Sequence, residues 1–272
     1  MATDPLAPLL DLADVAPAVD RARDRVDQAL RHRALRRHGG QVAAEVSLRS
    51  AVASAALEGY AHEREAVRAG TVTDPVLQGA LRVAGALPGL ADRWPKAPRQ
   101  VLARLHTLAA RGTVPEAALG RPTTPGYAAG NGAAAAGGAP AGSSSTEQPV
   151  AVPSALGARL DGLAGLVAGG TSVSPAVLAA VVHGELLVLR PFAGPSGVVA
   201  RAAARLTLVS TGFDPRGLVA VDLGHLEREP EYVGAAGAFA TGTEDGLRSW
   251  LRHYTTALEI AAAHLTTIAD EV

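Results

Sequence analysis

Apolar residues recur at helix-like spacing through the first part of the chain. From Val15 to Arg37, alanine, valine and leucine alternate with arginines at such a spacing, and Gly39-Gly40 ends the pattern. A second helix is predicted from Gln41 to Ala66, with an apolar stripe of residues three, four or seven positions apart: Val42, Val46, Ala53, Leu57 and Tyr60. Two amphipathic helices are therefore expected, the first with a solvated arginine face.

Two further helices are indicated by start and stop signals. Asp74-Pro75 combines a capping residue with a proline at the first helical position, and the pattern runs to about Ala86. The segment from Pro98 to Arg111 is also periodic, and Gly112 ends it.

Helical periodicity is interrupted in the middle of the chain and then returns. From Gly120 to Val150 glycine, proline, serine and alanine dominate, and we expect a flexible surface loop from Gly130 to Gln148. Helices are predicted beyond it, one of them capped by Ser174, over Ser154–Ala168, Pro175–Leu189, Val198–Ser210, Glu231–Ala240 and Glu244–Asp270. Since no long stretch alternates with period two, the expected class is all-α, with room for a small β-hairpin flap near the loop.

Composition narrows the functional classes. The 272 residues are 48% hydrophobic, which is ample for a buried core, and 25 basic and 26 acidic residues give a net charge of −1. No bulk attraction to nucleic acid or to an anionic membrane is expected. The chain has no cysteine, and its N-terminus resembles no export signal, so we expect a cytoplasmic protein without a membrane span.

The segment from His183 to Leu206 is the strongest candidate for chemistry. It reads as a helix, a glycine-containing loop and a second helix, and Gly194, Ser196 and Gly197 lie where the second helix begins. The N–H groups and dipole of a helix N-terminus suit a phosphate, and Arg201 and Arg205 share a face one turn below. Judged from these residues alone, a structural turn with solvated arginines is the favoured alternative.

The loop resembles that of the Fic (Fido) family, which reads His-Pro-Phe-x-Asp/Glu-Gly-Asn-Gly-Arg-x-x-Arg. Aligned from Arg190 to Arg201, this chain matches at Pro191, Phe192, Gly197 and Arg201. An Ala-x-x-x-His segment before the loop is also common in that family, and Ala179 and His183 fit it. The resemblance implies that the loop binds a nucleotide phosphate, with Ser196, Gly197 and Arg201 as the candidates.

A second motif strengthens the resemblance. Many Fic proteins carry an inhibitory helix with the pattern Ser/Thr-x-x-x-Glu-Gly/Asn, which Ser54, Glu58 and Gly59 fit. The resemblance implies that Glu58 pairs with Arg201. The resemblance covers about Val42 to Asp270. We therefore expect a helical region with the inhibitory-type helix over residues 41–119, the flexible loop over 120–150 and a Fic-like helical-bundle core over 151–272, with an N-terminal helical extension over 1–40 that lies outside the resemblance.

The departures from the family pattern fall on the catalytic positions. The family's catalytic histidine is Arg190 here, and a guanidinium has no acceptor lone pair with which to take a proton. The acidic residue for magnesium is Gly194, a glycine N–H is lost at Pro195, and the first arginine is Val198. Loss of a general base alone typically costs about 10²- to 10⁴-fold in rate. We therefore identify no catalytic residue and no metal ligand.

Several functional interpretations remain at this point. The favoured one is a degenerate Fic-family protein without adenylyltransferase activity, which contacts an unidentified protein partner, with Glu58–Arg201 as a structural ion pair. The alternative is a nucleotide-binding protein with residual or altered transferase activity gated by Glu58. ATP with magnesium would be its ligand, weakened by the loss of the acidic residue at Gly194. A transferase with relocated machinery would need another histidine, such as His183, to face the loop.

Other candidate residues favour ordinary structural roles. His225 precedes Glu227, Glu229 and Glu231, and a solvated charged loop is preferred there to a metal site. His253 and Tyr254 are expected in or near the core. The arginines from Arg21 to Arg37 are interleaved with Asp20, Asp24 and Asp27, so a solvated helix is preferred to a surface for an acidic partner.

Overall fold

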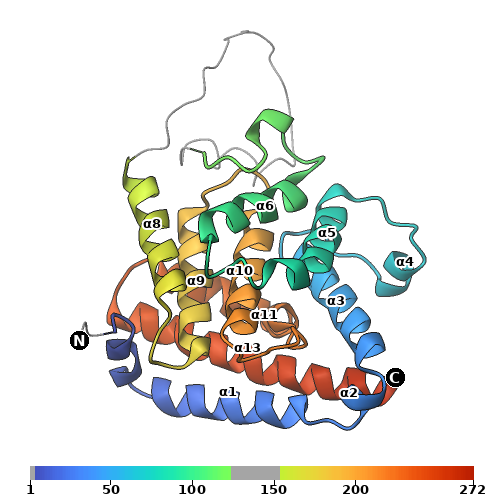
Figure 1. The fold of residues 1–272 in the computed structure, drawn as a ribbon, viewed down its shortest axis with the longest axis horizontal. Helices are drawn as coiled ribbons and strands as arrows, with labels where there is room; N and C mark the ends of the chain where they lie inside the picture. Colours follow the sequence, from blue (N-terminus) through green and yellow to red (C-terminus); the bar gives the residue numbers. More distant parts are fainter. Residues whose placement is uncertain (1–3, 124–153) are drawn as a thin grey trace.

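The protein is an assembly of packed helices. In the computed structural model, residues 4–123 and 154–272 are described. The elements are η1 (Ala7–Asp11), α1 (Val15–Leu30), α2 (Ala34–Arg37), α3 (Gly39–Ala56), α4 (Arg64–Arg68), α5 (Pro75–Leu90), α6 (Pro98–Ala110), η2 (Glu116–Ala118), α8 (Ser154–Gly169), α9 (Pro175–Leu189), α10 (Ser196–Ser210), α11 (Val221–Glu227), α12 (Glu229–Phe239) and α13 (Glu244–Glu271). The long α13 and α1 lie side by side along one edge, and α9 and α10 run through the middle (Figure 1).

The predicted all-α class is confirmed. The described part of the chain contains helices and one isolated bridge, between Arg111 and Val114, but no strand. The predicted loop from Gly130 to Gln148 lies outside the described residues, as does most of the region assigned to a β-hairpin flap. No helix in residues 4–123 or 154–272 is both long enough and apolar enough to cross a membrane.

Two predicted helices at the N-terminal end were too long. Helix α1 ends at Leu30, and the guanidinium of Arg216 donates to Leu30 O at 3.1 Å and to Leu35 O at 3.4 Å, so a distant residue stabilises the turn into α2. Helix α3 ends at Ala56, and Gly59 follows with a left-handed backbone at φ 91°. Tyr60 therefore lies beyond the predicted apolar stripe and is 45% exposed.

The capping signals agree with the structure. Asp74 Oδ1 accepts a hydrogen bond from Leu77 N at 2.8 Å, and α5 starts at Pro75, although it continues through Pro88 to Leu90 rather than ending near Ala86. Helix α9 has the predicted bounds, Pro175–Leu189. Local cap chemistry defined helix starts better than helix ends because the ends depend on tertiary contacts.

The short helix α11 was missed. Its residues were expected to form part of a solvated charged loop, but Val221, Asp222, Gly224 and His225 are buried. Gly224 lies so close to α13 that an added Cβ would overlap Ala257 O. Close packing against α13, rather than an apolar period, therefore defines this helix.

Helix α10 is the central element of the core. Every residue from Ser196 to Leu208 is buried, and one continuous apolar cluster extends from α1 through α13 around it. The largest fully buried side chains include Trp94, Trp250, Tyr254 and Phe213. A helix buried on all sides carries its polar residues into the interior, so Arg201 and Arg205 must find partners there.

Candidate functional site

The loop between α9 and α10 is bent at both ends by left-handed residues. Arg190, at the C-terminal end of α9, has φ 40°, and Gly194 has φ 74°. Phe192 and Ala193 are buried between these two positions. The side chain of Arg190 is exposed at the surface. Arg190, which occupies the position of the family's catalytic histidine, therefore lies at the exposed C-terminal end of α9.

His106 anchors this loop, and sequence reasoning missed it. Gly120 N donates to His106 Nδ1 at 2.9 Å, so the ring proton is on Nε2, which lies 2.9 Å from Ala193 O. The imidazole also stacks on Phe192 with ring centroids 4.6 Å apart. Burial lowers the pKa of His106, against the opposing effect of the Ala193 bond, so the neutral form is favoured. No sequence motif marks this residue, since its partners are backbone groups far along the chain.

Arg201 is buried and hydrogen-bonded on every side. Its Nε donates to Ser54 Oγ at 2.9 Å, and its Nη2 donates to Ser54 O at 2.8 Å and to Glu58 Oε1 at 2.7 Å. Its Nη1 donates to Tyr232 Oη at 3.3 Å, and Asp222 Oδ1 lies 3.6 Å from its Nε. Burial opposes the charge, but Tyr232, Glu58 and Asp222 outweigh it and hold the pKa of Arg201 above its ordinary value. The Glu58–Arg201 contact implied by the resemblance is thus present in the structure.

A second arginine extends this network. Arg205 Nη1 donates to Ser50 Oγ at 2.6 Å, and Ser50 Oγ donates to the buried carboxylate of Asp222 at 2.7 Å. Arg205 Nη2 donates to Gly217 O at 3.1 Å. The expectation of solvated arginines was therefore wrong, because Arg201 and Arg205 are only 3% and 7% exposed. Asp222 is a further site residue that sequence analysis missed, since α11 was not predicted.

The carboxylate of Glu58 lies at the N-terminal end of α10. An added Cβ on Gly197 would overlap Glu58 Oε1 and come within 2.9 Å of Arg201 Nη1. Glycine is therefore required for Glu58 to reach Arg201 across α10. An anion is favoured at this position by the helix dipole and by the first-turn N–H groups. Glu58 thus occupies the mouth to which the resemblance assigns a phosphate.

The loop offers fewer free donors than expected. Ser196 N donates to Gly194 O at 2.7 Å, so this N–H is used within the loop, and Pro195 has none. The buried Ser196 Oγ has no hydrogen-bond partner among the described residues. The structure thus brings Gly197, Arg201, Ser54 and Glu58 together, whereas the backbone of Ser196 is already engaged.

Three histidines and three larger aromatic residues form a buried cluster behind Arg201. His183 Nε2 lies 3.0 Å from Tyr232 Oη, which also contacts Arg201, and His225 Nδ1 lies 3.0 Å from His253 Nε2. Trp250 and Tyr254 pack against these rings. His183 is fully buried and bonded to Tyr232, so it faces the interior rather than the surface mouth of the loop.

The cluster histidines are held neutral. Burial, followed by the neighbouring Arg201, lowers the pKa of His183 well below its ordinary value, and burial likewise lowers that of His225. The pKa of His253 falls to about 4, because of burial first and Arg228 second. The expected core position of His253 and Tyr254 is confirmed, whereas His225 was wrongly expected in a solvated loop. Among the described residues no group of three or more His, Asp or Glu side chains is arranged to hold a metal ion.

Comparisons with known structures identify the fold. The structure matches Fic-1 from C. elegans with a TM-score of 0.68 and 17% identity, covering 97% of this chain and 75% of that one. A glutamate-to-glycine variant of Fic-1 matches with a TM-score of 0.68 and 18% identity, covering 96% and 74%. A Fic family protein from Desulfovibrio desulfuricans G20 matches with a TM-score of 0.67 and 20% identity, covering 94% and 76%. No protein-family model and no curated protein sequence matches the chain.

The class of protein follows from these matches. The chain has the Fic fold, and the match covers 97% of the chain, so it extends into the first forty residues, which the resemblance left outside. At such identities the likeness shows the fold alone, and function must be argued from the site.

Proposed function

We propose that this Fic-fold protein does not transfer nucleotides and acts as an interaction or regulatory protein that binds another macromolecule. In this proposal, the ion pair of Glu58 and Arg201 fixes α3 against the central helix. The observation that carries it is that buried Arg201 donates hydrogen bonds to Ser54, Glu58 and Tyr232 and lies 3.6 Å from the carboxylate of Asp222. A buried guanidinium needs such partners for stability alone, so its retention requires no bound phosphate.

The chemistry of the loop supports the loss of transfer. A transferase with this loop must deprotonate a target hydroxyl and stabilise charge on the phosphates. Arg190 cannot accept a proton and is exposed, and Gly194 and Val198 supply neither a carboxylate nor a cation. The only histidine bonded into the Arg201 network is His183, through Tyr232, and burial keeps it away from solvent.

One observation favours nucleotide binding as a second candidate function. Glu58 places an anion on Gly197 and Arg201, where a phosphate would meet the same groups, and its side chain is 18% exposed. Displacement of Glu58 would leave the N-terminal end of α10 and Arg201 for ATP, with or without magnesium. In this alternative, Glu58 competes with the ligand and gates a residual or altered transferase.

Titration calorimetry of ATP, with and without magnesium, separates the two functions. The titrated proteins are the wild type, Glu58→Gly, and Glu58→Gln, which keeps the hydrogen-bonding side chain but removes its charge. We expect no heat in any of them and no transfer of label from ATP to protein. Heat that appears in Glu58→Gly and is weaker in Glu58→Gln would overturn the proposal and support the gated nucleotide site.

A further inference from the structure

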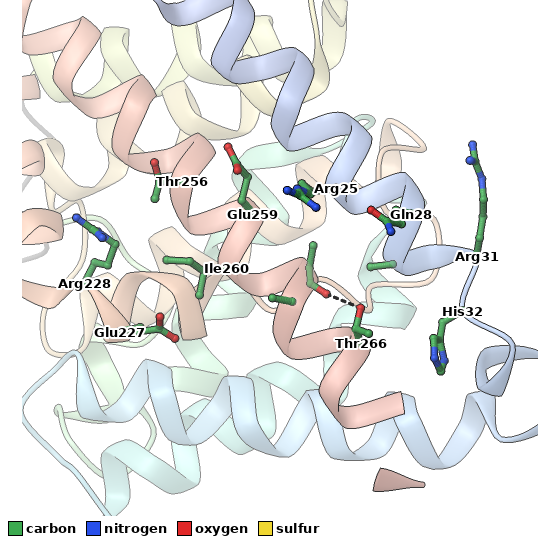
Figure 2. Close-up of a pocket in the computed structure, with 13 residues that line it drawn as sticks. Arg25, Gln28, Arg31, His32, Glu227, Arg228, Thr256, Glu259, Ile260 and Thr266 are labelled. Atoms are coloured by element: carbon green, nitrogen blue, oxygen red, sulfur yellow. Dashed lines mark hydrogen bonds between the residues drawn. The ribbon is translucent and has the colours of Figure 1, made fainter. Parts of the chain in front are cut away.

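A groove lies on the opposite part of the molecule from η2 and the α9–α10 loop. Its volume is about 770 Å³, and it runs between α1, the junction of α11 and α12, and α13 (Figure 2). The side chains of Arg25 and Gln28 border it on the α1 side, and those of Glu227 and Arg228 border it at the junction. A groove between packed helices has the shape in which a third helix packs.

The floor of the groove is largely apolar. It is formed by half-buried Ile260 and exposed Ala263 of α13 and by Ala29 of α1. Thr256 and Thr266 of the same helix also line the groove and are half-buried, and their hydroxyls donate to the backbone at Arg252 O and Ala262 O. A partner backbone can approach an apolar strip of small residues closely, and removing this apolar surface from water favours binding.

The groove has unpaired positive charge on one border. Arg25 and Arg31 are exposed, and neither has a carboxylate within 4.0 Å among the described residues. Two acidic residues also line the groove: Glu227 lies 2.9 Å from His264, and Glu259 lies 4.0 Å from Arg21. The third lining arginine, Arg228, is paired with Glu231 at 2.8 Å. Arg25 and Arg31 are therefore the lining arginines without a carboxylate partner among the described residues.

This positive charge continues past the end of α1. Arg33, Arg36 and Arg37 are exposed on the turn into α2 and on α2 itself, and within the described chain they have no carboxylate within the same distance. The nearby acids at the end of α13 are taken, since Asp270 lies 3.2 Å from His32 and Glu271 is bonded to Arg49. The interleaved aspartates that neutralise the first part of α1 are absent here.

We propose that this groove binds an amphipathic helix of a partner protein whose apolar face lies on Ile260 and Ala263 and whose acidic residues meet Arg25 and Arg31. The proposal supplies the binding surface of the function proposed above and rests on it. Arg31 directly follows the end of α1, and six residues at about 1.5 Å each place it about 9 Å from Arg25 along the helix axis, so the partner's acidic residues are spaced by a little under two turns. A nucleic acid fits less well, because the residues that line the groove include no Phe, Tyr or Trp on which a base could stack.

The binding test uses a synthetic helical peptide as the probe. It spans about five turns, with leucine and alanine on one face and glutamates two turns apart on its border. Fluorescence anisotropy measures its binding to the wild type, to Arg25→Glu/Arg31→Glu and to Ala263→Glu. We expect each variant to bind at least about tenfold more weakly, because one reverses the anchoring charges and the other places a charge on the apolar floor. Arg104→Glu, on an exposed and unpaired arginine of α6, should bind like the wild type.

A charge exchange sharpens the result. The same peptide with lysine in place of glutamate should bind Arg25→Glu/Arg31→Glu more tightly than it binds the wild type. All substituted positions are exposed, and circular dichroism with thermal melting verifies that each variant is folded.

Three outcomes would overturn the proposal. They are equal binding of a scrambled peptide of the same composition, equal binding by the wild type and both groove variants, and displacement of the peptide by a single-stranded oligonucleotide or by self-association of the protein. Because the groove variants leave Glu58 and α10 intact, their ATP titrations test the proposed function separately. If the peptide does not bind and the ATP titrations give no heat, only the groove proposal is rejected. If Glu58→Gly binds ATP, the proposed function is rejected.

Discussion

Two regions around α10 differ in the chemistry that they carry. In the loop before α10 and in its first turn, Arg190, Gly194 and Val198 supply no proton acceptor, no carboxylate and no second cation for a phosphate. Along its flank, by contrast, Arg201 is buried and donates hydrogen bonds to Ser54, Glu58 and Tyr232. The comparison teaches that the buried charged contacts of α10 form without catalytic side chains in the loop.

The two regions should also differ in what they contribute to stability. Arg190 is exposed, so water can solvate whatever replaces it, whereas Gly194 is half-buried and Val198 is buried. Arg201 and Asp222 are each 3% exposed, so removing either leaves the other as a buried charge with fewer partners. Substitution in the buried network should therefore cost more stability than substitution of Arg190.

The largest predicted effect is that of breaking the buried network. Arg201→Met should destabilise the protein by about 3–5 kcal/mol, because Asp222 and Glu58 lose their shared cation. Urea denaturation followed by circular dichroism measures the change, and Arg104→Met is the control on an exposed arginine, expected to stay within about 0.5 kcal/mol. If Arg201→Met costs less than about 1 kcal/mol, the network does not hold α3 to α10.

Lowering the pH should destabilise the folded protein through the buried histidine cluster that packs behind Arg201. The pKa of His253 is about 4 in the folded protein against an ordinary value of 6.5. Folding therefore favours the neutral imidazole, so its contribution is complete above about pH 6.5 and is lost as the pH falls toward 4. This difference in pKa corresponds to about 3 kcal/mol, and His183 and His225 act in the same direction.

The free energy of unfolding, measured between about pH 7 and pH 4.5, checks this prediction. His253→Gln keeps a polar side chain near His225 and should flatten the pH dependence. Exposed His38→Gln is the matched control and should leave it unchanged. A decline that is equally steep in His253→Gln would assign the acid sensitivity to other groups.

Filling the space that Gly197 leaves for the Glu58 carboxylate should destabilise the protein less, and the size of the effect should depend on whether Glu58 is present. An alanine at Gly197 would overlap the Glu58 carboxylate, so Gly197→Ala should cost about 1–3 kcal/mol despite the better helix propensity of alanine. In a Glu58→Gly background the overlap with Glu58 is absent and only the 2.9 Å approach to Arg201 Nη1 remains, so the same substitution should cost less, within about 1 kcal/mol of neutral. Additive effects in this double-mutant cycle would contradict the assigned contact.

The sequence predicted the parts of the fold that depend on local signals. Asp74-Pro75 and Ser174-Pro175 marked helix starts because a cap and a proline act within one turn. These signals need only a few neighbouring residues. The Glu58–Arg201 contact, between residues far apart in the chain, was instead implied by the resemblance to the Fic family, and the structure contains it.

The residues that sequence reasoning missed depend on distant contacts. Helix α11 has seven residues and lies close to α13 through Gly224, and only that packing reveals Asp222 as a partner of Arg201. His106 bonds two backbone groups, of Ala193 and Gly120, neither of which has a recognisable pattern. A single sequence contains no signal for such pairs, because backbone donors and acceptors look the same at every position.

The smallest predicted effect tests whether a proton acceptor at position 190, at the exposed end of α9, is enough to allow transfer. Arg190→His restores a group that can accept a proton, at an exposed position whose left-handed backbone histidine tolerates, so stability should change by less than about 1 kcal/mol. We expect no transfer of labelled AMP from ATP, in this variant or in Arg190→His/Glu58→Gly, because Gly194 and Val198 still provide neither a metal ligand nor a cation. Label incorporated by the double variant but not by Glu58→Gly alone would contradict this expectation. It would show that a nucleotide site is present beside Arg201 and that the wild-type loop lacks only a proton acceptor.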